Sequence, residues 1–166
     1  MQLIKANHQP TGETGKSGFE DLQCYKLSLD VMLNAHKVAS NFPSEEKYDL
    51  IQQLRRASKA ISANIAEGYG RYHYLDTLRF YSIARGTLNE TLSHLIVAKT
   101  LGYIKEDYYS EFSELIRETE RTLNGLMQYV RKKRRGDDLS DGRVIREEQI
   151  DYEIPTDIEG HDNLES

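Results

Sequence analysis

The chain has 166 residues and a formal net charge of -5, a length that favours one domain with a substantial core over two. No apolar run approaches the roughly 18 residues of a membrane span, and residues 1–7 lack the apolar centre of a signal peptide, so we expect a soluble, cytoplasmic protein with no membrane partner. The single cysteine, Cys24, excludes an internal disulfide and a multi-cysteine metal centre, and we expect it to be buried as a small apolar side chain.

Charge is divided unevenly along the chain. Residues 1–135 carry 20 basic against 16 acidic side chains, whereas residues 136–166 carry 2 against 11. The first part is therefore mildly basic and the second strongly acidic. The acidic total is compatible with an anionic partner for the basic part, because the distribution of charge matters more than its sum.

The predicted elements begin after a polar segment, residues 1–17, which has no sustained hydrophobic period and predicts a mobile N-terminal arm. Helices are expected over about residues 17–40, 44–69, 75–101 and 106–135. Ser44 is the expected N-cap of the second helix, and Gly102 is expected to stop the third in a left-handed conformation. Residues 136–166 predict a disordered acidic tail.

Four helices joined by short connections predict an all-α, antiparallel up-down-up-down four-helix bundle over residues 18–135. The last helix has one clean apolar stripe, made of Tyr108, Phe112, Leu115, Ile116, Thr119, Leu123, Leu126, Met127 and Val130.

The first and third helices have two apolar stripes each. On the first helix these are Leu22, Tyr25, Leu29, Met32 and Ala39, and Cys24, Leu27, Val31, Ala35, Val38 and Phe42; on the third they are Leu78, Tyr81, Leu88, Leu92 and Leu95, and Ile83, Gly86, Val97 and Leu101. One bundle core covers one stripe per helix, so we expect another copy of the chain to cover the second stripes. The alternative is an irregular bundle that buries both.

Several motifs in order carry a family resemblance. They are QLRRA at residues 53–57, AISANIAEGYGR at 60–71, FYSIARGTLNE at 80–90 and AKTLGYI at 98–104. Over about residues 19–134 the chain resembles the bacterial four-helix bundle family associated with intervening sequences in 23S ribosomal RNA genes. That family is similar to the accessory variability proteins of diversity-generating retroelements, which form a pentameric barrel and bind nucleic acid alongside a reverse transcriptase. The resemblance implies a homopentameric ring, with a reverse transcriptase as a candidate partner.

Basic side chains are the candidate contacts to nucleic acid: Arg55, Arg56, Arg71, Arg79, Arg131, Lys132, Lys133, Arg134 and Arg135. The run at residues 131–135 is equally well interpreted as a solvated helix end, where cations stabilise the helix dipole. The acidic tail is a candidate to fold back onto this run.

The alternative role for polar side chains of the second and third helices is a structural network that fixes helix register or subunit contacts. Its expected members are Asn64 and Glu67 of the second helix and Arg85 and Glu90 of the third. We expect Glu67 to lie opposite Arg85, because an unpaired guanidinium in an inner helix stripe is costly.

No catalytic, cofactor-binding or metal-binding pattern is recognisable. Glu90 and His94 lack the repeated Glu-x-x-His spacing of di-iron bundles, and no phosphate-binding glycine loop is present. His36 and His73 are expected to be packed or hydrogen-bonded. We therefore predict a non-catalytic oligomeric scaffold or adaptor that binds nucleic acid, RNA before DNA. The alternatives are a protein-only interaction module whose tail recruits a partner, and a retroelement accessory protein that works with a reverse transcriptase.

Overall fold

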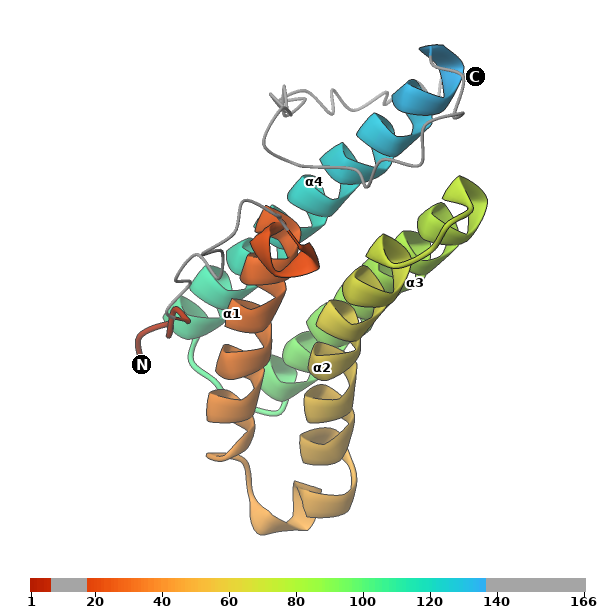
Figure 1. The fold of residues 1–166 in the computed structure, drawn as a ribbon. Helices are drawn as coiled ribbons and strands as arrows, with labels where there is room; N and C mark the ends of the chain where they lie inside the picture. The colour runs from red at the N-terminus through yellow and green to blue at the C-terminus, as the bar shows by residue number, and fades with distance from the viewer. Residues whose placement is uncertain (7–17, 137–166) are drawn as a thin grey trace, which may run out of the picture.

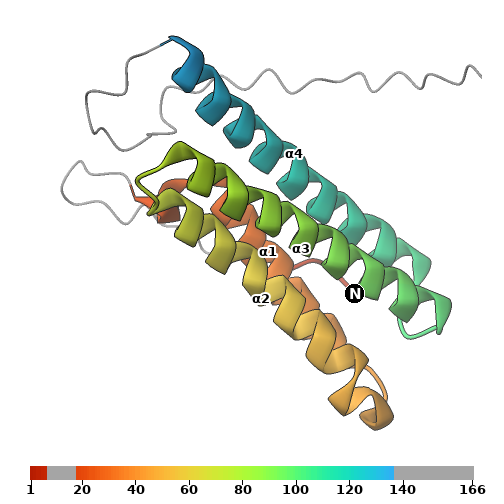
Figure 2. The ribbon, with the colours of Figure 1, turned by 90° about the vertical axis from the view of Figure 1, so that its right-hand side faces the viewer.

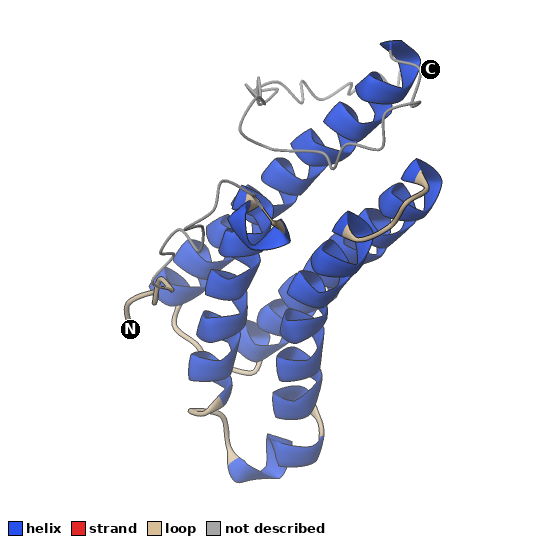
Figure 3. Cartoon of the chain, in the orientation of Figure 1, coloured by secondary structure: helices blue, strands red, loops and turns tan. Residues whose placement is uncertain are grey.

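The computed structural model describes residues 1–6 and 18–136, and every regular element within these ranges is helical. The elements are the 3-10 helix η1 (Phe19–Asp21), α1 (Gln23–Ala39), the 3-10 helix η2 (Ser44–Tyr48), α2 (Leu50–Tyr69), α3 (Tyr74–Thr100) and α4 (Glu106–Gly136), as Figures 1 and 3 show. None of the described helices is long and apolar enough to cross a membrane. Of the expected acidic tail, residues 136–166, Gly136 is the end of α4 and residues 137–166 lie outside the described residues.

The four α-helices lie side by side around one apolar core (Figure 2). Helix α1 packs against α2 and α4, and α3 packs against the same two helices. The turn from α2 to α3 and the C-terminal end of α4 lie at one end of the molecule, and η2 lies at the other (Figures 1 and 2). This arrangement leaves the outer face of each helix open to solvent or to a partner.

Core formation follows the predicted apolar periods most closely in α4. All nine members of its predicted stripe are buried. Cys24 is also fully buried, as expected. At Gly68 of α2, a Cβ atom would lie 2.7 Å from the buried ring of Tyr81, so glycine permits α2 and α3 to approach closely. Gly102 has the expected left-handed conformation, with a φ of 77°.

The starts of the first two helices differ from the predicted boundaries. Leu22 is extended, with φ -58° and ψ 128°, and separates η1 from α1. Asp49, with φ -124° and ψ -103°, likewise separates η2 from α2. Tyr103 donates a hydrogen bond to Glu46 of η2, which ties this turn to the connection between α3 and α4. Such a contact between distant residues is invisible in a local pattern.

The first six residues are attached to α1. The Ile4 N–H donates to Asn34 Oδ1 at 2.8 Å, and Asn34 Nδ2 donates to the Ile4 carbonyl at 2.7 Å. The Ala6 N–H donates to the carboxylate of Asp30. These bonds satisfy polar groups of the buried Asn34 and Asp30. This part of the expected N-terminal arm is therefore held against the helices, in contrast to the prediction of a mobile segment.

The two helices with double apolar stripes differ in how much of their apolar surface is covered. No large apolar side chain of α1 is exposed, which favours the alternative that the bundle itself buries both stripes of this helix. Its Tyr25 packs edge-on against Phe19, with ring centroids 5.0 Å apart. The expectation of an uncovered second stripe is confirmed for α3. Large apolar side chains are exposed on this helix and at the residue that follows it: Leu75, Ile83, Ile96, Val97 and Leu101.

Candidate nucleic-acid interface

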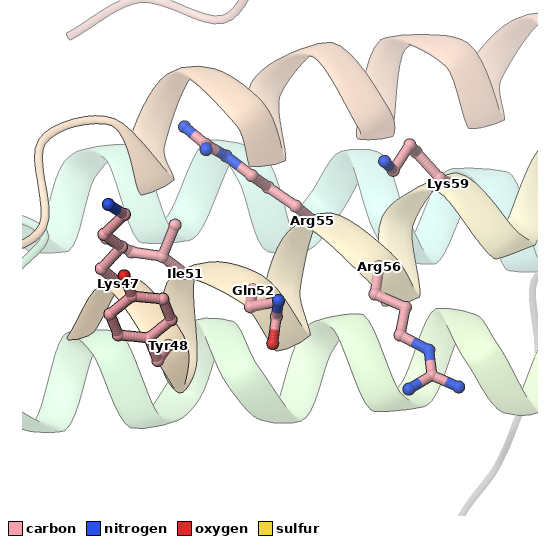
Figure 4. Close-up of a pocket in the computed structure, with 7 residues that line it drawn as sticks. All are labelled: Lys47, Tyr48, Ile51, Gln52, Arg55, Arg56 and Lys59. Carbon is pink, nitrogen blue, oxygen red and sulfur yellow. The ribbon is translucent and has the colours of Figure 1, made fainter.

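A hollow of about 390 Å³ lies on the outer face of α2 and the adjoining end of η2 (Figure 4). Its lining residues are Lys47, Tyr48, Ile51, Gln52, Arg55, Arg56 and Lys59. Spacings of three and four residues bring these side chains to one face of the helix. The lining holds four cations and no carboxylate, so its local charge is strongly positive.

The cations spread over the hollow from both flanks of α2. Figure 4 shows Arg55 and Lys59 pointing toward α1, whereas Arg56 points toward α3. Tyr48 lies at the η2 end, where the Lys47 ammonium is 5.2 Å from the centre of its ring. The hollow therefore joins an aromatic surface at one end to a row of positive charges.

Within the part of the chain that the structure describes, neither Arg55 nor Arg56 has an acidic partner. Among the described residues, no hydrogen bond or ion pair is made by the side chains of Arg55, Arg56 or Lys59, and the Nε atom of Arg55 is buried without an acceptor. Like charges three or four residues apart destabilise a helix by about 0.2–0.5 kcal/mol per pair. An anionic ligand would relieve this repulsion and provide the missing acceptors.

His36 of α1 reports the same positive environment. Its Nε2 atom is buried and has no hydrogen-bond partner in residues 1–6 and 18–136. Burial lowers the pKa of His36, and the nearby positive charges of Arg55 and Lys59 lower it further. The imidazole is a half-buried neighbour of the cations, in keeping with the expectation of a packed residue.

The other predicted basic contacts lie elsewhere. Arg71 forms an ion pair with Glu67 and stacks over Phe80, 4.6 Å from the ring centre. Arg79 is exposed on α3. At the C-terminal end of α4, Arg131, Lys132 and Lys133 are exposed, while the side chains of Arg134 and Arg135 lie outside the described residues. Arg55 and Arg56 thus line one hollow from opposite flanks of α2, and the α4 run lies at the other end of the molecule (Figure 1).

Five lining residues of the hollow were not predicted as site residues from the sequence: Lys47, Tyr48, Ile51, Gln52 and Lys59. Ile51, Gln52 and Lys59 lie three or four residues from Arg55, so helical spacing was an available signal for them. Lys47 and Tyr48 belong to η2, which the sequence did not predict as an element separate from the second helix.

Family membership follows from residues 20–125, which match the family described as 23S rRNA-intervening sequence protein. This range is more than half of the chain and contains all the quoted motifs. The chain belongs to this family. A solved structure from Bacteroides thetaiotaomicron VPI-5482, described as a protein with unknown function from the S23 ribosomal protein family, has a TM-score of 0.59 and 22% identity. The match covers 63% of this chain and 95% of that chain, and it shows the fold alone. No curated protein matches the chain.

In this member of the 23S rRNA-intervening sequence family, the predicted polar network is not formed within one copy. Among the described residues, no hydrogen bond or ion pair joins any two of its four members. The local partners are Asn64 with Ala60, Glu67 with Arg71, Arg85 with Asn124 and Glu90 with His94. The expected placement of Glu67 opposite Arg85 is therefore wrong. Glu67 instead forms an ion pair with Arg71, which lies four residues later in the chain, and Asn124 of α4 accepts a hydrogen bond from Arg85 at 3.3 Å.

The chemistry available at the hollow is that of anion binding. Guanidinium and ammonium groups donate to phosphate or carboxylate oxygens, and arginine does so with a planar pair of donors. Within residues 1–6 and 18–136, no group of three or more His, Cys, Asp or Glu side chains is placed to hold a metal ion. The exposed cations and the aromatic ring are the features that distinguish this face.

Proposed function

We propose that this family member is a non-catalytic, homo-oligomeric scaffold that binds RNA through the basic face of α2. The observation that carries the proposal is the row of Arg55, Arg56 and Lys59, which have no anionic partner among the described residues. Phosphate neutralisation by such side chains provides most of the affinity in sequence-independent nucleic-acid binding.

An extended polyanion fits this face better than a small anion. Within α2 the lining extends from Ile51 to Lys59, roughly 12 Å at about 1.5 Å per residue, and Tyr48 of η2 continues it. The cations lie on both flanks of α2 and do not converge on one point (Figure 4). A chain of phosphates can contact them in succession.

The proposed assembly is an antiparallel up-down-up-down bundle whose copies associate through the bare stripe of α3. Exposed apolar side chains on one helix and at the residue that follows it, here Leu75, Ile83, Ile96, Val97 and Leu101, favour a contact surface. Gly86 lies within this stripe, and a Cβ atom built there would meet no atom within 4 Å in one copy. Glycine in a helix costs about 1 kcal/mol relative to alanine, so close approach of a second backbone gives it a role. Five copies in a ring is the number that the family resemblance implies, and a ring would repeat the basic face.

Salt-dependent binding of structured RNA to the full chain tests the proposal. The double variant Arg55→Gln, Arg56→Gln is expected to bind at least tenfold more weakly at low salt. Its log-log salt slope should be shallower by about 0.7–0.9 for each lost phosphate contact. The matched control, Lys105→Gln with Arg117→Gln, removes the same charge from exposed positions on another face. Equal binding by both double variants would contradict the proposed site.

A protein-only interaction module is the second candidate. Asp107, Glu111 and Glu118 are exposed on α4, and the cations of α2 in a neighbouring copy could pair with them. In that case the parent chain would not bind RNA in a salt-dependent way, and the Arg55→Gln, Arg56→Gln double variant would change the mass of the assembly. Light scattering of the same variants separates the two functions.

A further inference from the structure

We infer that the hollow on α2 takes a single-stranded stretch of nucleic acid, with one base stacked on Tyr48 and phosphates held by Arg55 and Lys59. The inference rests on the proposed function and adds the form of the strand and the residue that contacts a base. Single-stranded RNA and single-stranded DNA share this chemistry.

The ring of Tyr48 is unusually open to solvent. Its relative exposure is 79%, and among the described tyrosines only Tyr72, at 88%, is comparable. The Tyr48 ring lies at one end of the hollow, beside the half-buried side chain of Ile51 (Figure 4). An exposed aromatic face next to cations is the arrangement with which proteins stack the bases of single strands.

Groups that donate hydrogen bonds to phosphate lie in the same hollow as Tyr48. Tyr48 ends η2, Arg55 lies in the second turn of α2, and both line the hollow although Asp49 separates the two helices. Arg55 is half-buried, its Nε has no acceptor among the residues that the structure describes, and Lys59 lies one turn further on the same flank. A strand that begins with a base on Tyr48 therefore brings its following phosphates to Arg55 and Lys59.

A duplex cannot use all of these groups together. Its bases are already stacked on one another, so only phosphates and groove edges reach the protein, and the face of Tyr48 would have no base to contact. Contacts from Lys47, Arg56 and the other cations remain available to a duplex. Contact with the ring of Tyr48 therefore distinguishes a single strand from a duplex, whereas contact with the cations does not.

Fluorescence of a single introduced tryptophan tests the stacking directly. The chain contains no tryptophan, so Tyr48→Trp gives the full chain one indole at the position of interest. The probes are an oligouridylate and an oligothymidylate of about ten nucleotides, a blunt RNA duplex of the same length and inorganic polyphosphate. Both single strands are expected to quench the emission in a saturable way, and polyphosphate and duplex are not. Tyr72→Trp, an equally exposed position at the turn after α2, is the control and should not be quenched.

Affinity measurements with Tyr48→Ala and Tyr48→Phe provide the second readout. Loss of one stacked base is expected to weaken single-strand binding by about 5- to 100-fold in Tyr48→Ala, with little change in Tyr48→Phe. Duplex binding should be unaffected by either substitution. Circular dichroism checks the fold, which should tolerate both changes at so exposed a position.

Three results would overturn the inference. One is equal quenching at positions 48 and 72. The second is a Tyr48→Ala variant that binds single strands as tightly as the parent chain. In both cases RNA binding that still depends on Arg55 and Arg56 would leave the proposed function standing. The third, absence of binding to every nucleic acid at low salt, would overturn both. Tighter binding of the oligouridylate than of the oligothymidylate would identify RNA as the natural ligand. Equal affinities would show that a base and phosphates are sufficient for binding.

Discussion

Helices α1 and α3 have the same double apolar pattern in sequence, yet only α3 is left with a bare face. On α1 no large apolar side chain is exposed. Phe19 packs on one end of this helix, and residues 1–6 are hydrogen-bonded along another flank. On α3 no other described segment takes that place, and Ile83, Ile96 and Val97 remain 42–44% exposed.

The difference shows that an apolar period predicts which face of a helix must be buried, but does not predict which segment or partner buries it. For α1 the cover comes from segments of the same chain. For α3 we propose that it comes from another copy. Each prediction below alters one side of this contrast, beginning with the largest expected effect.

Charging the bare face of α3 should dissociate the assembly. The double variant Ile83→Lys, Val97→Lys would bury two ammonium groups in the proposed interface, so we expect self-association to weaken at least 100-fold, or by about 2.7 kcal/mol. Sedimentation or light scattering measures the mass, and circular dichroism checks that the exposed sites tolerate lysine. Ser110→Lys with Gln128→Lys, at exposed sites on α4, adds the same charge as a control. A parent chain that is monomeric at micromolar concentration would contradict the proposed assembly.

Two helical glycines should respond to alanine with opposite signs. Gly68→Ala would place a Cβ 2.7 Å from the buried Tyr81 ring, so the free energy of unfolding should fall by about 1–3 kcal/mol. Gly86→Ala meets nothing in one copy and should stabilise that copy by about 0.5–1 kcal/mol. Urea unfolding measures both. If the backbone of a second copy approaches α3 closely at Gly86, Gly86→Ala should also weaken self-association. The mass of the assembly measured over a dilution series would reveal this.

Removal of the buried side-chain amide of Asn34 on α1 should lower the free energy of unfolding more than removal of the exposed amide of Asn89 on α3. Asn34→Ala removes both bonds to Ile4 and should lower the free energy of unfolding by about 1–2 kcal/mol. Asn89→Ala, on the exposed side of α3, should change it by less than about 0.5 kcal/mol. In a chain that lacks residues 1–6, the cost of Asn34→Ala should shrink. An unchanged cost would show that the N-terminal segment does not depend on this amide.

The smallest effect concerns the pH response of α1. The pKa of His36 is lowered in the folded chain by burial, by Arg55 and by Lys59, so protonation favours the unfolded state. The stability contributed by neutral His36 is fully present above pH 6.5, the ordinary pKa of histidine, and is lost as the pH falls through the lowered pKa. Arg55→Gln should raise the pKa of His36 in an NMR titration, because one positive charge is removed. Lys105→Gln should leave it unchanged, and a shift there would indicate a long-range cause.

The candidate site was only partly readable from the sequence. Arg55 and Arg56 could be named because charge is a property of each residue alone. The same reasoning gave equal weight to Arg71, which the structure shows paired with Glu67 and stacked on Phe80. Which cations remain unpaired depends on the neighbours that packing supplies.

For the fold as a whole, local information was sufficient to predict four helices, the buried stripe of α4 and the left-handed stop at Gly102. Helical period and backbone preference are carried by residues within a few positions of one another. Packing alone decided that residues 1–6 lie on α1, that Arg85 bonds to Asn124 and that Asp49 separates η2 from α2. Each of these depends on which distant segments of the chain come into contact. Packing of the shared core determines those contacts, and a local apolar period does not predict them.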